Sequence, residues 1–164
     1  APKSAIATVV MGLVFGAAFK LSMKAIVMPL LGSPAINQAY HYLAGNHAAL
    51  PGMLIVVIFG AGFGEELVFR GFLFERLGKL FGSGVGAKAA IVFFTSLGFG
   101  LLHYPVQGLP GAEQATIVGL VFGTFFAIRR RIFGLMVAHA AFDVTAVLII
   151  YWDLESYVAR LVFN

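Results

Sequence analysis

Long apolar runs alternate with short polar or glycine- and proline-rich stretches along the whole chain. About five of these runs are expected to be helices, at 5–31, 50–80, 87–103, 113–128 and 132–152. A helix that crosses the hydrocarbon core of a bilayer needs about 20 predominantly apolar residues. The second run is long for one crossing, and its glycine-rich stretch predicts a kink. The pattern therefore predicts an all-α, multi-pass transmembrane helix bundle with an interior polar site.

The same pattern divides a single membrane domain, residues 1–164, into four parts. A first helix (1–32) precedes a polar linker (33–47), a helical core (48–152) and a short amphipathic tail (153–164). Glycines four residues apart recur in three helices and let helices approach closely in lipid. We expect them to serve packing: Gly12 and Gly16, Gly60 and Gly64, Gly119 and Gly123.

Composition and charge support a lipid environment. The chain is 60% hydrophobic and 11% charged, whereas soluble domains are about 45–50% apolar and about 25% charged. An ordinary soluble domain, a disordered chain and a nucleic-acid-binding module are therefore excluded. Cysteine is absent, which excludes disulfides, thiolate zinc sites and a cysteine nucleophile. The basic residues gather at the second-to-third and fourth-to-fifth connections, and the positive-inside rule places both on the cytoplasmic side: Arg76, Lys79, Lys88, Arg129, Arg130 and Arg131.

Ionisable residues inside apolar runs are candidates for function, because a charge at mid-bilayer costs at least about 2.5–3.5 kcal/mol. Glu66 and Arg70 are four residues apart and share a helix face, so we expect them to form an ion pair. Glu65 points about 100° away from Glu66, which leaves its carboxylate proton-active. A general base beside a structural ion pair has this arrangement. The alternative is an ion-pair cluster that serves packing alone.

Two other helices carry histidines at helical depth. His103 ends the third apolar run, and His139 and Asp143 lie four residues apart on one face of the fifth. The second pair suits a shared ligand or a hydrogen bond. The alternatives are a hydrogen-bonded interfacial histidine at His103 and a purely structural His139–Asp143 bond.

Four further ionisable residues receive no catalytic role. Lys20 and Lys24 share a face of the first helix, and we expect their ammonium groups to reach the membrane interface. The alternatives are that they line a wet cavity or face a partner. His41 and His47 lie in the linker and are expected to be solvated.

Carboxylates and histidines on three separate helices suggest activation of water, and no serine-based arrangement competes. Their order resembles the CPBP family of intramembrane proteases, which includes CAAX prenyl endopeptidases and bacteriocin-processing or immunity proteins. That family shows EExxxR, then FxxxH, then HxxxN or HxxxD on separate helices. The resemblance covers about residues 50–152. Its three motifs stand here as Glu65-Glu66-xxx-Arg70, Phe99-xxx-His103 and His139-xxx-Asp143.

The resemblance implies a hydrolase, an intramembrane endopeptidase that cleaves membrane-anchored or lipidated peptides. It implies that Glu65 activates water with the help of His103. Glu66 and Arg70 would hold the helix and orient the site.

The resemblance also gives His139 and Asp143 a role, either stabilising the oxyanion or completing a metal site. Where the family carries asparagine, its amide donates a hydrogen bond, which an ionised Asp143 does not. Asp143 therefore favours orienting His139 or binding a metal. A divalent metal such as zinc would take its ligands from Glu65, His103, His139 and Asp143. A metal-free glutamate mechanism is equally compatible, and the HExxH zinc signature is absent.

The expected location is a bacterial plasma membrane, with membrane lipid and a peptide or protein substrate as partners and no nucleic acid. Two other functions remain open. One is a catalytically silent membrane subunit or scaffold of a larger complex, which the glycine-rich helix faces would suit. The other is a transporter-like bundle that uses the same polar groups as a proton relay.

Overall fold

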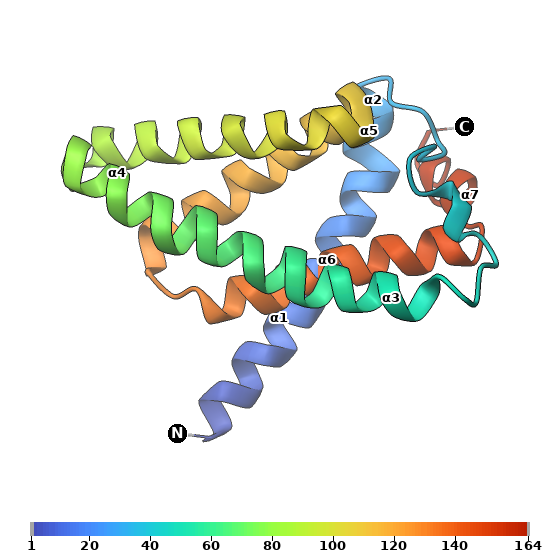
Figure 1. The fold of residues 1–164 in the computed structure, drawn as a ribbon, viewed down its shortest axis with the longest axis horizontal. Coiled ribbons are helices and arrows are strands. Elements are labelled where there is room, and N and C mark those ends of the chain that lie inside the picture. Colours follow the sequence, from blue (N-terminus) through green and yellow to red (C-terminus); the bar gives the residue numbers. More distant parts are fainter. Residues whose placement is uncertain (1, 164) are drawn as a thin grey trace. The chain divides into compact units, whose positions relative to one another are not determined.

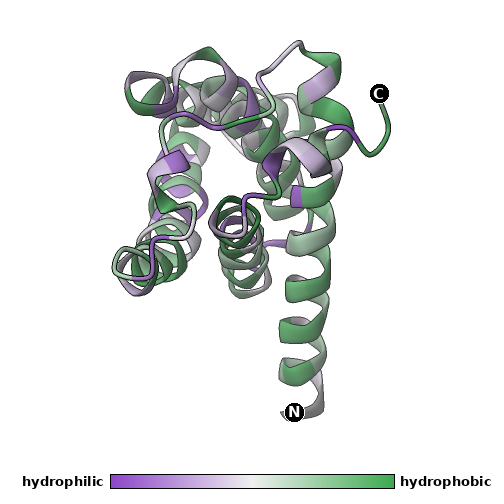
Figure 2. Ribbon diagram, turned by 90° about the vertical axis from the view of Figure 1, so that its right-hand side faces the viewer, coloured by the Kyte–Doolittle hydropathy of each residue, from purple (hydrophilic) through white to green (hydrophobic). Residues whose placement is uncertain are grey.

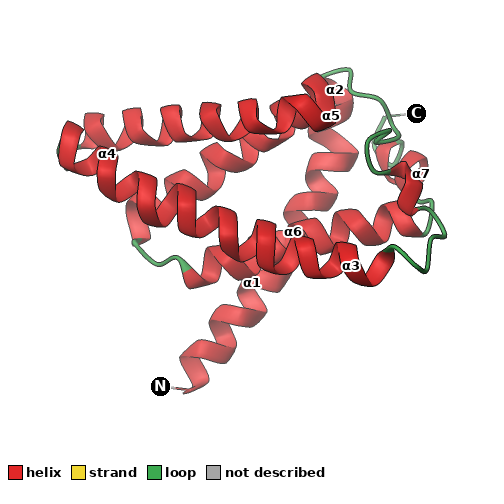
Figure 3. Cartoon of the chain, viewed as in Figure 1, coloured by secondary structure: helices red, strands yellow, loops and turns green. Residues whose placement is uncertain are grey.

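The computed structural model describes residues 2–163, and all regular structure in that range is helical (Figure 3). This confirms the all-α fold class. The helices run in the order shown in Figure 1: α1 (Pro2–Ser22), η1 (Met23–Val27), α2 (Met28–Leu30), η2 (His41–Leu43), α3 (Leu50–Ile55), η3 (Val56–Glu65), η4 (Leu67–Leu73), α4 (Phe74–Phe81), α5 (Val85–Arg129), α6 (Phe133–Tyr151) and α7 (Glu155–Ala159).

Four helical stretches of the described chain are long and apolar enough to cross a membrane: Ser4–Leu30, Leu50–Phe81, Val85–Arg129 and Phe133–Tyr151. The third and fourth predicted helices both lie in α5, which has 45 residues. At 1.5 Å per residue, an unbroken helix of that length would span about 68 Å, twice the hydrocarbon core. Gly108, with φ 64° and ψ −163°, breaks α5 between Pro105 and Pro110. The two arms fold back on each other (Figure 1), so the expected turn after the third helix is present.

The glycine-rich segment of the second span is helical. Residues Val56–Glu65 and Leu67–Leu73 wind as π-helix, in which each N–H bonds the carbonyl five residues earlier. The expected kink stays a prediction, because π-helical turns are themselves a cause of helix kinks. π-Helical turns are rare overall, but many of those known lie at functional sites. Here one segment ends at Glu65 and the other begins directly after Glu66.

The chain forms two compact units. The first contains Ala1–Phe63 and Met136–Asn164, and the second contains Gly64–Leu135. The boundary between Phe63 and Gly64 lies inside η3, in the glycine-rich segment. The single-domain organisation stays a prediction.

In the first unit, small residues let α6 pack closely against its neighbours. A Cβ atom on Gly62 would lie 2.8 Å from the Ala140 Cα atom. A Cβ atom on Gly16 would lie 2.9 Å from the Ala141 side chain. Both glycines therefore mark backbone-to-backbone approaches, as small residues do between helices in lipid. Gly60 differs from these two glycines because its surroundings are open. A Cβ atom at Gly60 would meet only the Val56 side chain, at 4.0 Å.

A buried ion cluster ties the linker to the C-terminal helix in the same unit. Glu155 is 1% exposed, and its carboxylate accepts hydrogen bonds from Lys24 Nζ at 3.2 Å and Asn37 N at 2.8 Å. The Nδ1 atom of His41 lies 3.3 Å from the other carboxylate oxygen. Lys24 Nζ also donates to the Ala35 carbonyl. Lys24 is thus held by the linker and α7, and its expected reach to the membrane interface stays a prediction.

The linker histidines also have partners. His41 faces Glu155, and His47 Nδ1 is hydrogen-bonded to the Tyr151 hydroxyl. The backbone N–H of Gly45 donates to the Tyr151 carbonyl at 2.9 Å. The expected solvation is wrong for His41, which is half-buried against Glu155, whereas His47 is exposed, as expected, and also contacts Tyr151.

The second unit packs η4, α4 and the two arms of α5 together. The rings of Phe74 and Phe126 stand edge to face with centroids 5.2 Å apart. A Cβ atom on Gly119 would lie 2.9 Å from the Ser96 Cα atom, so the two arms of α5 meet closely there.

Apolar residues occupy most of α1, as the green colour of its ribbon shows in Figure 2, and large apolar side chains are exposed along the helices. Ile6, Val14, Phe72 and Leu102 are each more than half exposed. In water such surface would be unfavourable, whereas lipid is its natural solvent.

Candidate functional site

The Glu66–Arg70 ion pair lies in the interior of the second unit. The Arg70 Nη1 atom donates to Glu66 Oε1 at 2.8 Å, and the two residues are 2% and 0% exposed. The pair predicted from the four-residue spacing therefore forms. A buried ion pair needs further hydrogen bonds to offset its desolvation, and Arg70 Nη2 supplies one by donating to the Gly119 carbonyl at 3.2 Å.

Aromatic rings enclose the guanidinium of Arg70. Its central carbon lies 5.3 Å from the ring centroid of Phe99, 5.9 Å from that of Phe122 and 6.0 Å from that of Phe69. Rings at this distance attract a cation through their quadrupole. The Arg70 side chain is thereby held in one place by its ion pair, by a carbonyl and by three rings.

Phe99 connects this ion pair to His103. The two rings stand edge to face with centroids 4.6 Å apart. The Nδ1 atom of His103 lies 2.8 Å from the Phe99 carbonyl oxygen, and a carbonyl only accepts, so Nδ1 carries the proton. In the neutral ring the other nitrogen, Nε2, is then the proton acceptor. One phenylalanine of the FxxxH motif thus lies against both the EExxxR arginine and the motif histidine.

Glu65 is the last residue of η3 and is half-buried. Its carboxylate attracts the Arg70 guanidinium electrostatically, alongside that of Glu66. The second unit therefore contains four of the predicted site residues, Glu65, Glu66, Arg70 and His103, and Phe99 links Arg70 to His103. Their catalytic roles stay predictions.

The other two predicted site residues belong to the first unit. His139 Nε2 lies 3.5 Å from Asp143 Oδ2, with side chains 4% and 23% exposed. The predicted pairing of these residues along α6 therefore forms. Lys20 joins them, because it is 7% exposed and its ammonium lies 4.9 Å from the ring centroid of Phe142. The expectation that Lys20 reaches the membrane interface is wrong, since it is buried and the Asp143 carboxylate attracts it.

Neither unit supplies a metal-ligand set by itself. Catalytic zinc sites use three protein ligands. The ligands proposed from the sequence divide between the units, Glu65 and His103 in one, His139 and Asp143 in the other. Among residues 2–163, no three histidine, aspartate or glutamate side chains gather in a metal-holding group. The residues of each unit do not fit a metal ion, and the metal site stays a prediction.

Two contributors to the site went unrecognised in the sequence. The Gly119 carbonyl accepts a hydrogen bond from Arg70, and Phe99 lies between Arg70 and His103. A small-residue pair at Gly119 and Gly123 signalled a close helix approach, although not that a carbonyl would be used there. Phe99 was noted only as a motif letter.

A comparison with protein families finds a match. The family model described as type II CAAX prenyl endopeptidase Rce1-like matches residues 47–145, more than half of the chain. No curated protein and no solved structure matches the chain. The matched range contains every predicted site residue, from Glu65 to Asp143. The chain belongs to the Rce1-like family of type II CAAX prenyl endopeptidases, and thus to the CPBP intramembrane proteases.

Proposed function

We propose that this integral membrane protein hydrolyses a peptide bond in membrane-anchored or lipidated peptides, with Glu65 as general base and His103 as its assistant. Family membership supports a peptidase, and the membrane setting supports a substrate held in lipid. The observation that carries the assignment of residues is the position of Phe99, which contacts both the Arg70 guanidinium and the His103 ring. A bacterial plasma membrane is the proposed location.

The proposed reaction uses one water molecule. The Glu65 carboxylate takes a proton from water as the water oxygen attacks the peptide carbonyl carbon. The carbon–nitrogen bond then breaks, and the proton on Glu65 passes to the leaving amine. The unprotonated Nε2 of His103 accepts a hydrogen bond from the attacking water and so orients it. A new carboxylic acid and a free amine are the products.

Positioning falls to the neighbouring groups. Glu66 and Arg70 hold the π-helical segment against the second arm of α5 through the Gly119 carbonyl. His139, oriented by Asp143, is the candidate for stabilising the oxyanion. No metal takes part in this mechanism.

The deciding experiment compares peptide termini, by mass spectrometry, in membranes of wild-type and Glu65→Gln cells at matched protein level. A matched control is Glu75→Gln, which removes another carboxylate from the same span, one that is exposed and paired with Lys79. Specific uncut termini are expected to accumulate in Glu65→Gln and not in Glu75→Gln. Identical termini in all three, with the Glu65 variant folded, would overturn the proposal and favour a catalytically silent membrane subunit.

Metal independence has its own test. Cleavage by the purified protein is expected to continue after dialysis against a strong chelator, because the proposed water activation uses a carboxylate and an imidazole. Loss of cleavage that zinc restores would contradict the metal-free part of the mechanism. Glu65 would then be assigned as a zinc ligand instead of the general base.

A further inference from the structure

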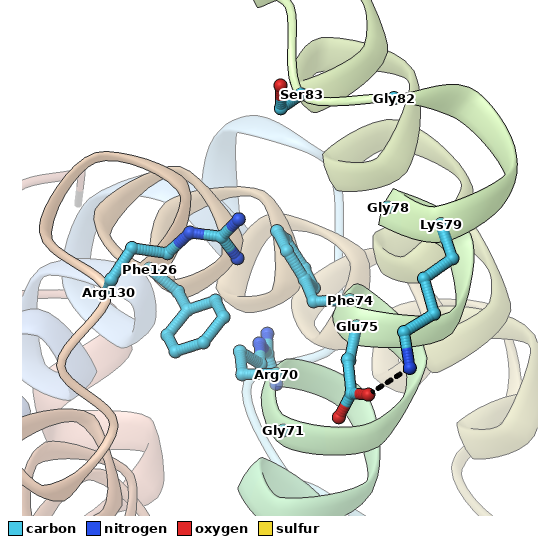
Figure 4. A pocket seen from close by; sticks show the side chains of 10 residues that line it. All are labelled: Arg70, Gly71, Phe74, Glu75, Gly78, Lys79, Gly82, Ser83, Phe126 and Arg130. Atoms are coloured by element: carbon cyan, nitrogen blue, oxygen red, sulfur yellow. Dashed lines mark hydrogen bonds and ion pairs between the residues drawn. The ribbon is translucent and has the colours of Figure 1, made fainter.

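A cavity of about 260 Å³ opens in the second unit, at the end where α4 turns into α5. Figure 4 shows its lining side chains, with three cationic residues, Arg70, Lys79 and Arg130, from three parts of the chain. Glu75 is the acidic residue of the lining, and it already pairs with Lys79 at 2.6 Å. Cationic side chains outnumber acidic ones around this cavity.

Arg130 is the cation of the lining that has no acidic partner. Arg70 is compensated by Glu66 and Lys79 by Glu75. Arg130 is exposed, and among residues 2–163 its guanidinium contacts the Phe126 ring, 5.7 Å from the centroid, and no carboxylate. An exposed guanidinium at the mouth of a cavity suits a phosphate, whose oxygens it can bind in pairs.

Residues from both basic connections of the chain, the α4–α5 turn and the α5–α6 connection, line this cavity. Gly82 and Ser83 from the α4–α5 turn line it together with Arg130 from the α5–α6 connection. Both connections therefore lie at the same end of the second unit, as the charge pattern predicted. That end carries further basic residues whose positions mark it as cytoplasmic under the positive-inside rule: Arg76, Lys88, Arg129 and Arg131.

The dimensions favour the headgroup of a lipid over a larger ligand. Pockets that enclose drug-sized molecules measure about 300–1,000 Å³, and this one is smaller and open. The rings of Phe74 and Phe126 form an apolar wall of the cavity, and Ser83 adds a hydroxyl group to its lining. Large apolar side chains next to the lining residues are exposed, among them Leu80 at 77% and Ile128 at 71%. Acyl chains can therefore remain outside while a phosphate enters.

We propose that this cavity binds the phosphate headgroup of an anionic phospholipid of the cytoplasmic leaflet, through Arg130 and Lys79 with Arg70 behind them. Basic pockets between transmembrane helices on the cytoplasmic side bind such headgroups in other membrane proteins. The inference goes beyond the proposed peptidase activity and does not depend on it.

Native mass spectrometry of the full chain tests the proposal. The protein is released from phosphatidylcholine nanodiscs that contain phosphatidylglycerol, and the phosphatidylglycerol that stays bound is measured. Arg130→Gln is expected to lower the retained phosphatidylglycerol at least about tenfold, because it removes charge-assisted hydrogen bonds to the bound phosphate. The matched control is Arg131→Gln, which removes the same charge from the same connection but lies outside the cavity. It is expected to retain lipid as the wild type does.

Each alternative outcome decides the question. Equal losses in Arg130→Gln and Arg131→Gln would mean diffuse attraction to an anionic surface and would overturn the cavity site. A second arm measures thermal stabilisation by inorganic phosphate in phosphatidylcholine alone. Stabilisation that requires Arg130, with no retention of phosphatidylglycerol, would make the cavity a site for free phosphate and overturn the lipid assignment. Wild-type-like unfolding of both variants without anionic lipid shows that they fold. The readout is binding, so its failure leaves the peptidase proposal unchanged.

Discussion

The buried Glu66–Arg70 pair gives a quantitative test of the architecture around the site. The two side chains are 0% and 2% exposed and meet at 2.8 Å. Arg70→Met would leave the Glu66 carboxylate buried beside an apolar chain. Removing one partner of a buried pair costs about 3–5 kcal/mol, and the lost hydrogen bond to the Gly119 carbonyl adds about 1 kcal/mol. Glu66→Leu would strand the guanidinium in the same way. The double variant buries no charge, so we expect it to regain most of the stability.

Thermal unfolding of the purified variants in detergent measures this cycle. A loss of 3–5 kcal/mol corresponds to roughly 6–20 °C in Tm for a chain of this size. The double variant is expected to unfold within a few degrees of the wild type and yet to lose cleavage, because Glu65 and His103 would no longer be oriented by the pair.

The exposed Glu75–Lys79 pair is the matched control for this cycle. It has the same four-residue spacing and side chains 61% and 62% exposed. Its coupling should stay below about 1 kcal/mol, as solvent screens an exposed pair. Single variants at Glu66 and Arg70 that unfold within about 2 °C of the wild type, or a double variant as unstable as the sum of the two, would refute the reasoning.

Three further predictions rest on other contacts. Gly62→Ala should lower Tm by several degrees, because the new Cβ atom would lie 2.6 Å from the Cβ atom of Ala140. Gly60→Ala lies in open space and should stabilise the helix by up to about 1 kcal/mol. Equal Tm values for the two variants would contradict this reasoning. Glu155→Gln should cost about 3–5 kcal/mol by stranding Lys24, and should speed protease cleavage of the linker 33–47. An unchanged cleavage rate would show that the ion cluster does not hold the linker.

Local patterns explain what was predicted well. The Glu66–Arg70 and His139–Asp143 pairs both form, because residues four apart on a helix share a face whatever surrounds them. The catalytic roles of these residues, and the metal, stay predictions. The transmembrane character followed from the apolar runs and the low share of charged residues. The turn within α5 followed from two prolines and Gly108, since proline lacks the N–H that continues a helix.

The wrong predictions all concern partners far away along the chain. Lys20 was expected at the membrane interface and is instead buried against Phe142 of α6. His41 meets the Glu155 carboxylate across 114 residues. Each outcome depends on which helix faces pack together, and neither spacing nor composition contains that information.

The sequence by itself determined that this protein is an all-α membrane protein and which ionisable residues share a helix face, because helix period and lipid solubility act locally. Tertiary structure alone decided that Arg70 reaches the Gly119 carbonyl 49 residues away, and that Gly82, Ser83 and Arg130 line one cavity. In lipid, almost every helix face is apolar, so hydrophobicity does not select which faces meet. Close packing at small residues and the pairing of buried polar groups make that choice, and both appear only once the helices are assembled.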